Sequence, residues 1–281
     1  MRILNRPSKE DWIAALERPT IDHRDLEAKV AEILTDVRSR GDEAVRAWTA
    51  KFDHAEMQDI AVAPAAFDEA EAALSEELKE AIRIASANIA TFHHRQSLNE
   101  AAVETMPGVS CWRKQVPIEK VGLYIPGGSA PLFSTVLMLG IPAAIAGCRE
   151  IVLCSPPGKD GKIHPAILYA AKTAGIEKVF AVGGVQAIGA MAYGTETIPA
   201  VYKIFGPGNQ YVTAAKQLIN REGVAIDMPA GPSEVMVVAD DTASPEFVAA
   251  DLLSQAEHGP DSQVVLLTTS DTLVPRVLES I

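Results

Sequence analysis

Two residues in the carboxyl-terminal part of the sequence have the types and the spacing of a metal site. Gln255 and His258 lie three positions apart in the stretch LLSQAEHGPDSQ. Ser-Pro at 244–245 is a typical helix start and Gly-Pro at 259–260 a typical stop. We therefore expect both side chains in the last turn of one helix and on the same face, whereas Glu257 points nearly to the opposite side.

This pair could serve as metal ligands or could stabilise the helix. An imidazole nitrogen and an amide oxygen suit zinc, which accepts nitrogen and oxygen ligands in open catalytic sites. Gln is an uncommon ligand, and a lone His258 would also interact favourably with the helix C-terminal dipole. Two ligands do not complete a site, so the spacing alone leaves both interpretations open.

Three glycine-rich stretches are the other candidates for chemistry. YIPGGSAP, AVGGVQAI and IFGPGNQYV each follow an apolar run that is typical of a buried strand. Glycine lets the backbone approach a ligand, and a following helix N-terminus presents free N–H groups to a phosphate. None matches G-x-G-x-x-G, since Tyr211 stands where the third glycine would be, and each could be a turn that needs glycine. Three on successive strands predict a shared crevice for a phosphorylated or dinucleotide-like ligand.

The elements that position these stretches alternate between strand and helix. Continuous apolar strands followed by helices indicate a parallel sheet covered on both faces. Strands are expected at 120–128, 150–157, 178–184, 201–208, 233–240 and 263–270.

The amino-terminal part has a helical pattern instead. Apolar residues recur at helical spacing in 22–41 and in a second, longer amphipathic stretch at 65–96. The sequence therefore predicts an α/β protein with two incomplete, Rossmann-like parallel-sheet units and a helical amino-terminal segment.

A proline-rich link, DMPAGPSE, indicates the boundary between the two α/β units. We expect an arm at 1–20, a first α/β domain from 21–125 plus 232–281, and a second Rossmann-like domain at 126–231. An apolar face at 273–281 predicts a terminal helix, and the uncapped apolar end at Ile281 suggests that the sequence stops inside the first domain.

Composition and charge exclude some partners. The net charge of -12 argues against nucleic acid or an anionic membrane as the main partner. Prolines and glycines interrupt the uncharged run from Val121 to Cys148, so we expect a strand and a buried helix there, with no membrane span. An odd number of cysteines without C-x-x-C spacing indicates a reducing compartment, which agrees with a cytoplasmic location.

Longer motifs carry a resemblance to a known family. GLYIPGGSAPLFSTVLM, FGPGNQYV, DMPAGPSEVMVVAD and LLSQAEHGPDSQVVLLT resemble histidinol dehydrogenase, in this order and over most of the chain from about residue 20. The resemblance implies a zinc-dependent, NAD-linked oxidation of L-histidinol through L-histidinal to L-histidine, the last steps of histidine biosynthesis. It also implies a homodimer with two incomplete Rossmann-like domains.

The resemblance also assigns roles to residues. Tyr124, Gln186 and Asn209 match the NAD contacts, and Ser233 matches a substrate contact. Gln255 and His258 match two zinc ligands that also meet the substrate. It places the Glu-His acid-base pair and two more zinc ligands, an aspartate and a histidine, beyond Ile281, so no catalytic acid-base residue is expected in these 281 residues.

Two alternatives stay open on the sequence alone. One is a related alcohol dehydrogenase that acts, for example, on a sulfonated diol. The loop GGSAPLFST discriminates against it, because it looks like the histidinol-specific form. The other is a short, non-catalytic NAD- or partner-binding homologue, which a stop codon directly after Ile281 in an intact gene would favour.

The missing acid-base pair leads to a first prediction. We expect the purified 281-residue chain to show little or no histidinol-dependent reduction of NAD, because no side chain is present to remove the hydroxyl proton. NADH formation followed by absorbance is the measurement. Turnover comparable to that of a full-length relative assayed in parallel would contradict it.

Overall fold

The computed structural model describes residues 2–17, 23–97, 100–127, 131–228, 233–257 and 262–281. The chain forms two compact units, Arg24–Pro229 and Met1–His23 together with Ala230–Ile281. Each unit has its own hydrophobic core.

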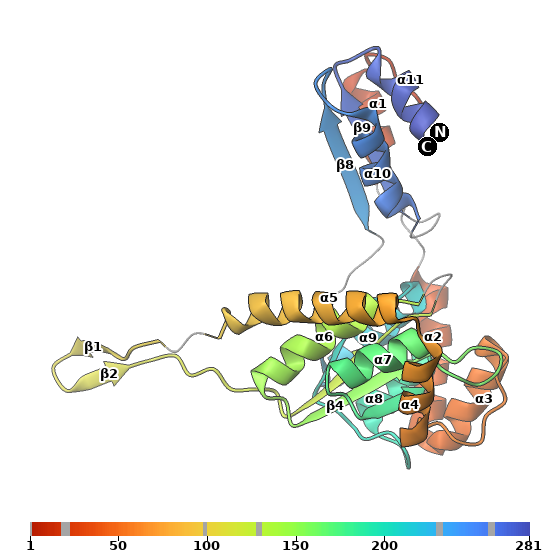
Figure 1. The fold of residues 1–281 in the computed structure, drawn as a ribbon, viewed down its shortest axis with the longest axis vertical. Helices are drawn as coiled ribbons and strands as arrows, with labels where there is room; N and C mark the ends of the chain where they lie inside the picture. Colours follow the sequence, from red (N-terminus) through yellow and green to blue (C-terminus); the bar gives the residue numbers. More distant parts are fainter. Residues whose placement is uncertain (1, 18–22, 98–99, 128–130, 229–232, 258–261) are drawn as a thin grey trace. The chain divides into compact units, whose positions relative to one another are not determined.

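A parallel five-stranded sheet is the centre of the larger unit (Figure 1). Its strands are β3 (Lys120–Tyr124), β4 (Glu150–Ser155), β5 (Lys178–Ala181), β6 (Lys203–Phe205) and β7 (Ala225–Ile226). The order β5-β4-β3-β6-β7 places the first strand beside the fourth, with all neighbours parallel. This order is that of a doubly wound sheet, in which the chain reverses direction across the sheet between β3 and β6.

Helices cover both faces of this sheet, as the apolar strands predict. The connecting helices are α6 (Phe133–Ala146), α7 (Pro165–Thr173), α8 (Gly184–Tyr193) and α9 (Gln210–Arg221). Residues of α6 and α7 belong to one core cluster and residues of α8 and α9 to the other. The α/β class and the strand–helix alternation predicted from the sequence are confirmed.

The amino-terminal helices complete both layers. They are α2 (His23–Arg40), α3 (Asp42–Asp53), α4 (Pro64–Ala73) and α5 (Glu76–His94). The first two pack with α8 and α9, and the last two with α6 and α7. Between them, Ala61 forms an antiparallel bridge to Phe180 at the β5 edge of the sheet.

Two details differ from the sequence expectations. The long amphipathic stretch is two helices, because the backbone turns at Leu74 and Ser75 caps α5 by accepting the Leu78 N–H. The compact units also group 24–125 with 126–228, whereas the expected first domain joined 21–125 to 232–281. The apolar faces of α2 to α5 share core clusters with the helices that cover the sheet, which accounts for the grouping; the expected domain assignment itself stays a prediction.

An exposed hairpin and the smaller unit complete the fold. Strands β1 (Val103–Met106) and β2 (Val109–Cys111) pair antiparallel and are exposed throughout. In the smaller unit, α1 (Lys9–Leu16) accompanies the parallel pair β8 (Glu234–Ala239) and β9 (Gln263–Thr268) and the helices α10 (Pro245–Ala256) and α11 (Leu273–Ser280). The expected terminal helix is therefore present. Among the described residues, no helix has both the length and the apolar character that a membrane crossing requires.

Helix α3 is held at its N-terminus by a residue distant in sequence. No side chain of its own N-cap, Gly41, is available, and the Asp42 N–H instead donates to the Glu196 carboxylate at 2.8 Å. Thr197 also donates to the Asp42 carboxylate. These bonds connect α3 to the segment that follows α8.

Replacing Glu196 should therefore weaken the attachment of α3. We expect Glu196→Ala to lower the free energy of unfolding by about 0.5–2 kcal/mol, as loss of a helix cap does. Chemical denaturation measures the change. Glu43→Ala is the matched control, because the exposed Glu43 makes only a surface ion pair with Arg40, and an equal loss in both variants would contradict the capping role.

Candidate functional site

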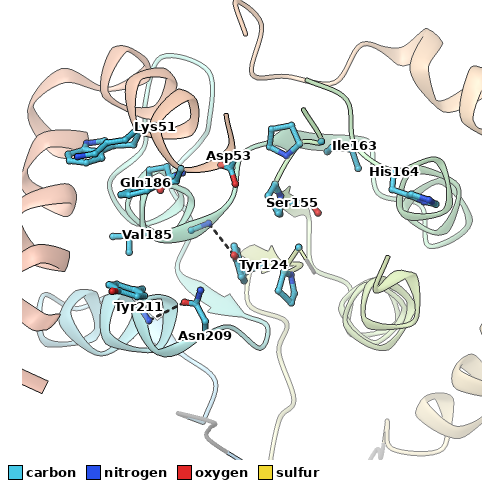
Figure 2. A pocket seen from close by; sticks show the side chains of 18 of the residues that line it. Lys51, Asp53, Tyr124, Ser155, Ile163, His164, Val185, Gln186, Asn209 and Tyr211 are labelled. Carbon is cyan, nitrogen blue, oxygen red and sulfur yellow. Dashed lines mark hydrogen bonds between the residues drawn. The ribbon is translucent and has the colours of Figure 1, made fainter. Parts of the chain in front are cut away.

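A pocket of about 1310 Å³ opens at the carboxyl ends of the sheet strands. Its lining comes from the turns after β3, β4, β5 and β6 and from α2 and α3 (Figure 2). The turns after β3 and β6 meet here, at the point where the winding reverses, which is the position where doubly wound sheets bind ligands. All lining residues belong to the larger unit.

Tyr124 is the last residue of β3 and lies under the pocket. Its side chain is buried, and its hydroxyl oxygen accepts the Gly184 N–H at 3.1 Å. Burial raises the pKa of Tyr124 to about 12, so the phenol is neutral at physiological pH. Tyr124 thus holds the start of α8 beside the end of β3 as an uncharged hydrogen-bonding group.

Gln186 presents the strongest sign of a polar ligand. It lies on the first turn of α8 and is fully buried, and neither its amide nitrogen nor its amide oxygen has a partner in the part of the chain that the structure describes. Buried amides nearly always have partners, so an unsatisfied one that lines a pocket indicates a group that a ligand completes. Ser155 at the end of β4 is the same case, with a buried hydroxyl that has no partner.

Asn209 caps the helix on the other side of the crevice. Its side-chain oxygen accepts the N–H groups of Tyr211 and Val212, each at 3.1 Å. Since the oxygen is engaged in this cap, the amide nitrogen is the group that remains to meet a ligand (Figure 2). The N-termini of α8 and α9 both line this crevice, and the positive ends of their helix dipoles favour the negative charge of phosphate oxygens.

The glycine turn before Asn209 allows the close approach that forms the crevice. Gly206 has a φ of 130°, and a Cβ atom there would overlap the carbonyl of Tyr124. Only glycine fits both conditions. The structure brings Tyr124, Gln186 and Asn209, one from each glycine-rich stretch, to one pocket, and their assignment as NAD contacts stays a prediction.

Sequence reasoning missed the contribution of α3. Asp53 at the end of this helix lines the pocket, has a buried carboxylate oxygen without a partner, and has its pKa raised by burial. Trp48 and Lys51 line the same side, with the Lys51 ammonium 4.4 Å from the Trp48 ring. No local motif marks these residues, because only tertiary packing brings α3 over the strand ends. Ser155 was detectable in principle, since it ends a predicted strand.

The residues expected to bind substrate and metal belong to the smaller unit. Ser233 is exposed just before β8, and Gln255 is half-buried in the last turn of α10, where it donates to the Ser262 hydroxyl at 3.2 Å. The prediction for His258 falls outside the described residues. Within the described ranges, no three His, Cys, Asp or Glu side chains gather as a metal site. These side chains alone therefore do not fit a complete zinc centre, and Gln255 offers one potential ligand atom.

Comparisons with known proteins agree with this arrangement. A histidinol dehydrogenase from Bacteroides thetaiotaomicron is 60% identical over 281 residues, all of this chain and 66% of the relative. One from Xanthomonas campestris is 56% identical over 270 residues, 95% of this chain and 62% of the relative. The chain thus spans slightly less than two thirds of the length of these curated relatives.

A solved structure and a family model point the same way. The crystal structure of histidinol dehydrogenase from Elizabethkingia anophelis matches with a TM-score of 0.91 at 55% identity, over 98% of this chain and 63% of that one. The family model of histidinol dehydrogenase matches residues 16–281. With the pocket at the switch point of its sheet, the chain belongs to the histidinol dehydrogenase family.

Proposed function

We propose that this protein takes part in the oxidation of L-histidinol through L-histidinal to L-histidine, with NAD as the hydride acceptor. Family membership supports the reaction, and the pocket of the larger unit supports the acceptor. The observation that carries the assignment is the buried Gln186 amide without a partner at the pocket wall. As the relatives are longer, we assign to this segment the dinucleotide pocket and part of the substrate site, in a cytoplasmic homodimer.

The pocket residues fit a dinucleotide in their chemistry. When bound, NAD accepts a hydride. The Gln186 amide can donate and accept in-plane hydrogen bonds, the neutral Tyr124 shapes the floor, and the Asn209 amide nitrogen donates at the N-terminus of α9. The dipoles of the two helix N-termini favour the negative charge of a pyrophosphate. A bound ligand would exclude water from these buried polar groups, which strengthens the hydrogen bonds to it.

The substrate side of the proposal rests on the smaller unit. We assign Ser233 as a substrate contact, and Gln255 and His258 as two zinc ligands that also meet the substrate. Their membership in the matched segment supports this, together with the position of Gln255 in the last turn of α10. Further ligands have to come from residues outside this set, since structural and catalytic zinc sites use at least three protein ligands.

The unpartnered Gln186 amide generates a prediction in which stability and binding change in opposite directions. Gln186→Leu removes a buried unsatisfied amide at similar volume, so we expect the unliganded chain to become more stable by about 1 kcal/mol or more. The same change should weaken NAD binding at least tenfold, because the ligand loses its partner. Calorimetric titration and chemical denaturation measure the two effects.

Two variants act as comparisons for this experiment. Gln217→Leu makes the same substitution at an exposed position on α9 and should leave the affinity unchanged. Asn209→Ala should weaken NAD binding but lower stability by about 0.5–2 kcal/mol, since it removes a helix cap. Unchanged NAD affinity in Gln186→Leu would refute the assignment of this pocket.

The metal assignment has its own test. In the chain extended to the length of its relatives, we expect His258→Ala to lose most of its zinc, because removing one ligand opens the coordination shell. Zinc content after dialysis, by atomic absorption, is the measurement. His94→Ala, on the exposed end of α5, is the control. Equal zinc in the two variants would eliminate His258 as a ligand.

A further inference from the structure

An ion pair between a buried lysine and a half-buried aspartate lies directly behind the glycine turn of the crevice. Lys216, in the middle of α9, is only 5% exposed, and its ammonium pairs with the carboxylate of Asp227. Asp227 follows β7, where its backbone N–H donates to the Ile204 carbonyl and extends the pairing with β6. Neither side chain lines the pocket.

The pair forms hydrogen bonds with both the backbone N–H and the backbone carbonyl of Gly206. The Gly206 N–H donates to the Asp227 carboxylate at 2.8 Å, and the Lys216 ammonium donates to the Gly206 carbonyl at 2.8 Å. Gly206 is therefore held from the helix on one side and from the edge strand on the other. Since Gly206 begins the turn that ends at Asn209, the pair controls the orientation of that turn.

These hydrogen bonds are important because Gly206 is conformationally free and lies in close contact with the Tyr124 carbonyl. Its φ of 130° belongs to a region that glycine can leave easily, and its Cα lies where a side chain would overlap the Tyr124 carbonyl. A rotated Gly206 peptide would reposition Asn209, the cap from which α9 begins. The bonds to Lys216 and Asp227 exclude such alternatives.

Stability alone is a poor explanation for this pair. Desolvation of the buried Lys216 ammonium offsets part of its attraction to Asp227, and an apolar pair of similar volume is often equally stable. An apolar pair could not hold an N–H and a carbonyl of the same residue. The property that distinguishes this ion pair from an apolar pair is therefore that it fixes the backbone conformation at Gly206.

We propose that Lys216 and Asp227 are positioning residues that hold the Gly206–Asn209 turn in the conformation required for dinucleotide binding. This inference rests on the proposed function of the pocket. It assigns a role in dinucleotide binding to two residues that lie behind the turn and do not contact the ligand.

The test replaces the pair as a unit and measures NAD binding. Lys216→Met with Asp227→Leu removes both bonds to Gly206, leaves no lone buried charge and keeps the net charge unchanged. We expect the dissociation constant for NAD, by calorimetric titration of the purified chain, to rise at least tenfold. Lys216→Met with Asp227→Asn keeps an acceptor for the Gly206 N–H and should give a smaller rise. A double variant with Leu that folds and binds NAD within twofold of the unsubstituted chain would overturn the proposal.

A second measurement covers the case in which the Leu variant does not fold. Hydrogen exchange of the unsubstituted chain should show a strongly protected Gly206 amide without NAD, and the Asn variant should lose part of this protection. A Gly206 amide that exchanges freely in the unsubstituted chain would contradict the proposal that Lys216 and Asp227 hold Gly206 in place. Ile82→Val, on the buried face of α5 and distant in sequence from the turn, should lower stability and leave NAD binding unchanged.

Failure of the proposed function gives a different result. An unsubstituted chain that takes up no NAD, with a protected Gly206 amide, would refute the dinucleotide pocket and the purpose assigned to the pair. The hydrogen bonds from Lys216 and Asp227 to Gly206 would then stand as a structural feature. Normal NAD binding with an unprotected Gly206 amide would refute only the proposal that these two residues position the turn.

Discussion

The parallel pairing of β3 with β6 is the constraint on which the rest of the larger unit depends. The helices that follow these two strands pack in different core clusters, so the turns at their ends diverge and leave a crevice. The crevice stays narrow because Gly206 meets the Tyr124 carbonyl where any side chain would overlap it. Tyr124 then reaches Gly184 and links the third turn to the same place. Three turns that are distant in sequence thus form one pocket.

The pocket keeps polar groups in a state that folding alone would not favour. The Gln186 amide, the Ser155 hydroxyl and one Asp53 carboxylate oxygen are buried without partners. Each such group lowers the stability of the unliganded chain, by an amount on the order of 1–3 kcal/mol for a neutral one. The surrounding core of α8 and the central strands is apolar and fully buried, which supplies the stability that these groups reduce. Among the described residues, four of the six buried side-chain atoms without a partner belong to residues that line this cavity, and the other two belong to Asp42 and Thr49 on α3. This concentration indicates selection for binding at the cavity.

Local patterns predicted the central strands, their helices and the crevice, because a buried parallel strand is a short apolar run and its following turn needs glycine. The same patterns did not predict the break between α4 and α5, since apolar spacing continues through Leu74 and Ser75. Asp53 was missed for a different reason. Its role depends on α3 packing against α8, a long-range contact that leaves no trace in the neighbouring residues.

The two kinds of predicted site residue also differ in how far structure supports them. Tyr124, Gln186 and Asn209 line one pocket, and the described residues that line it all belong to the larger unit. Ser233 and Gln255 belong to the smaller unit, where Gln255 has only a hydroxyl partner among the described residues. A metal ion bound there would need more ligand atoms than Gln255 supplies. On the proposed function, defects in the two units should be separable: changes at Gln186 should alter the affinity for NAD, and changes at Gln255 should alter the binding of metal and substrate.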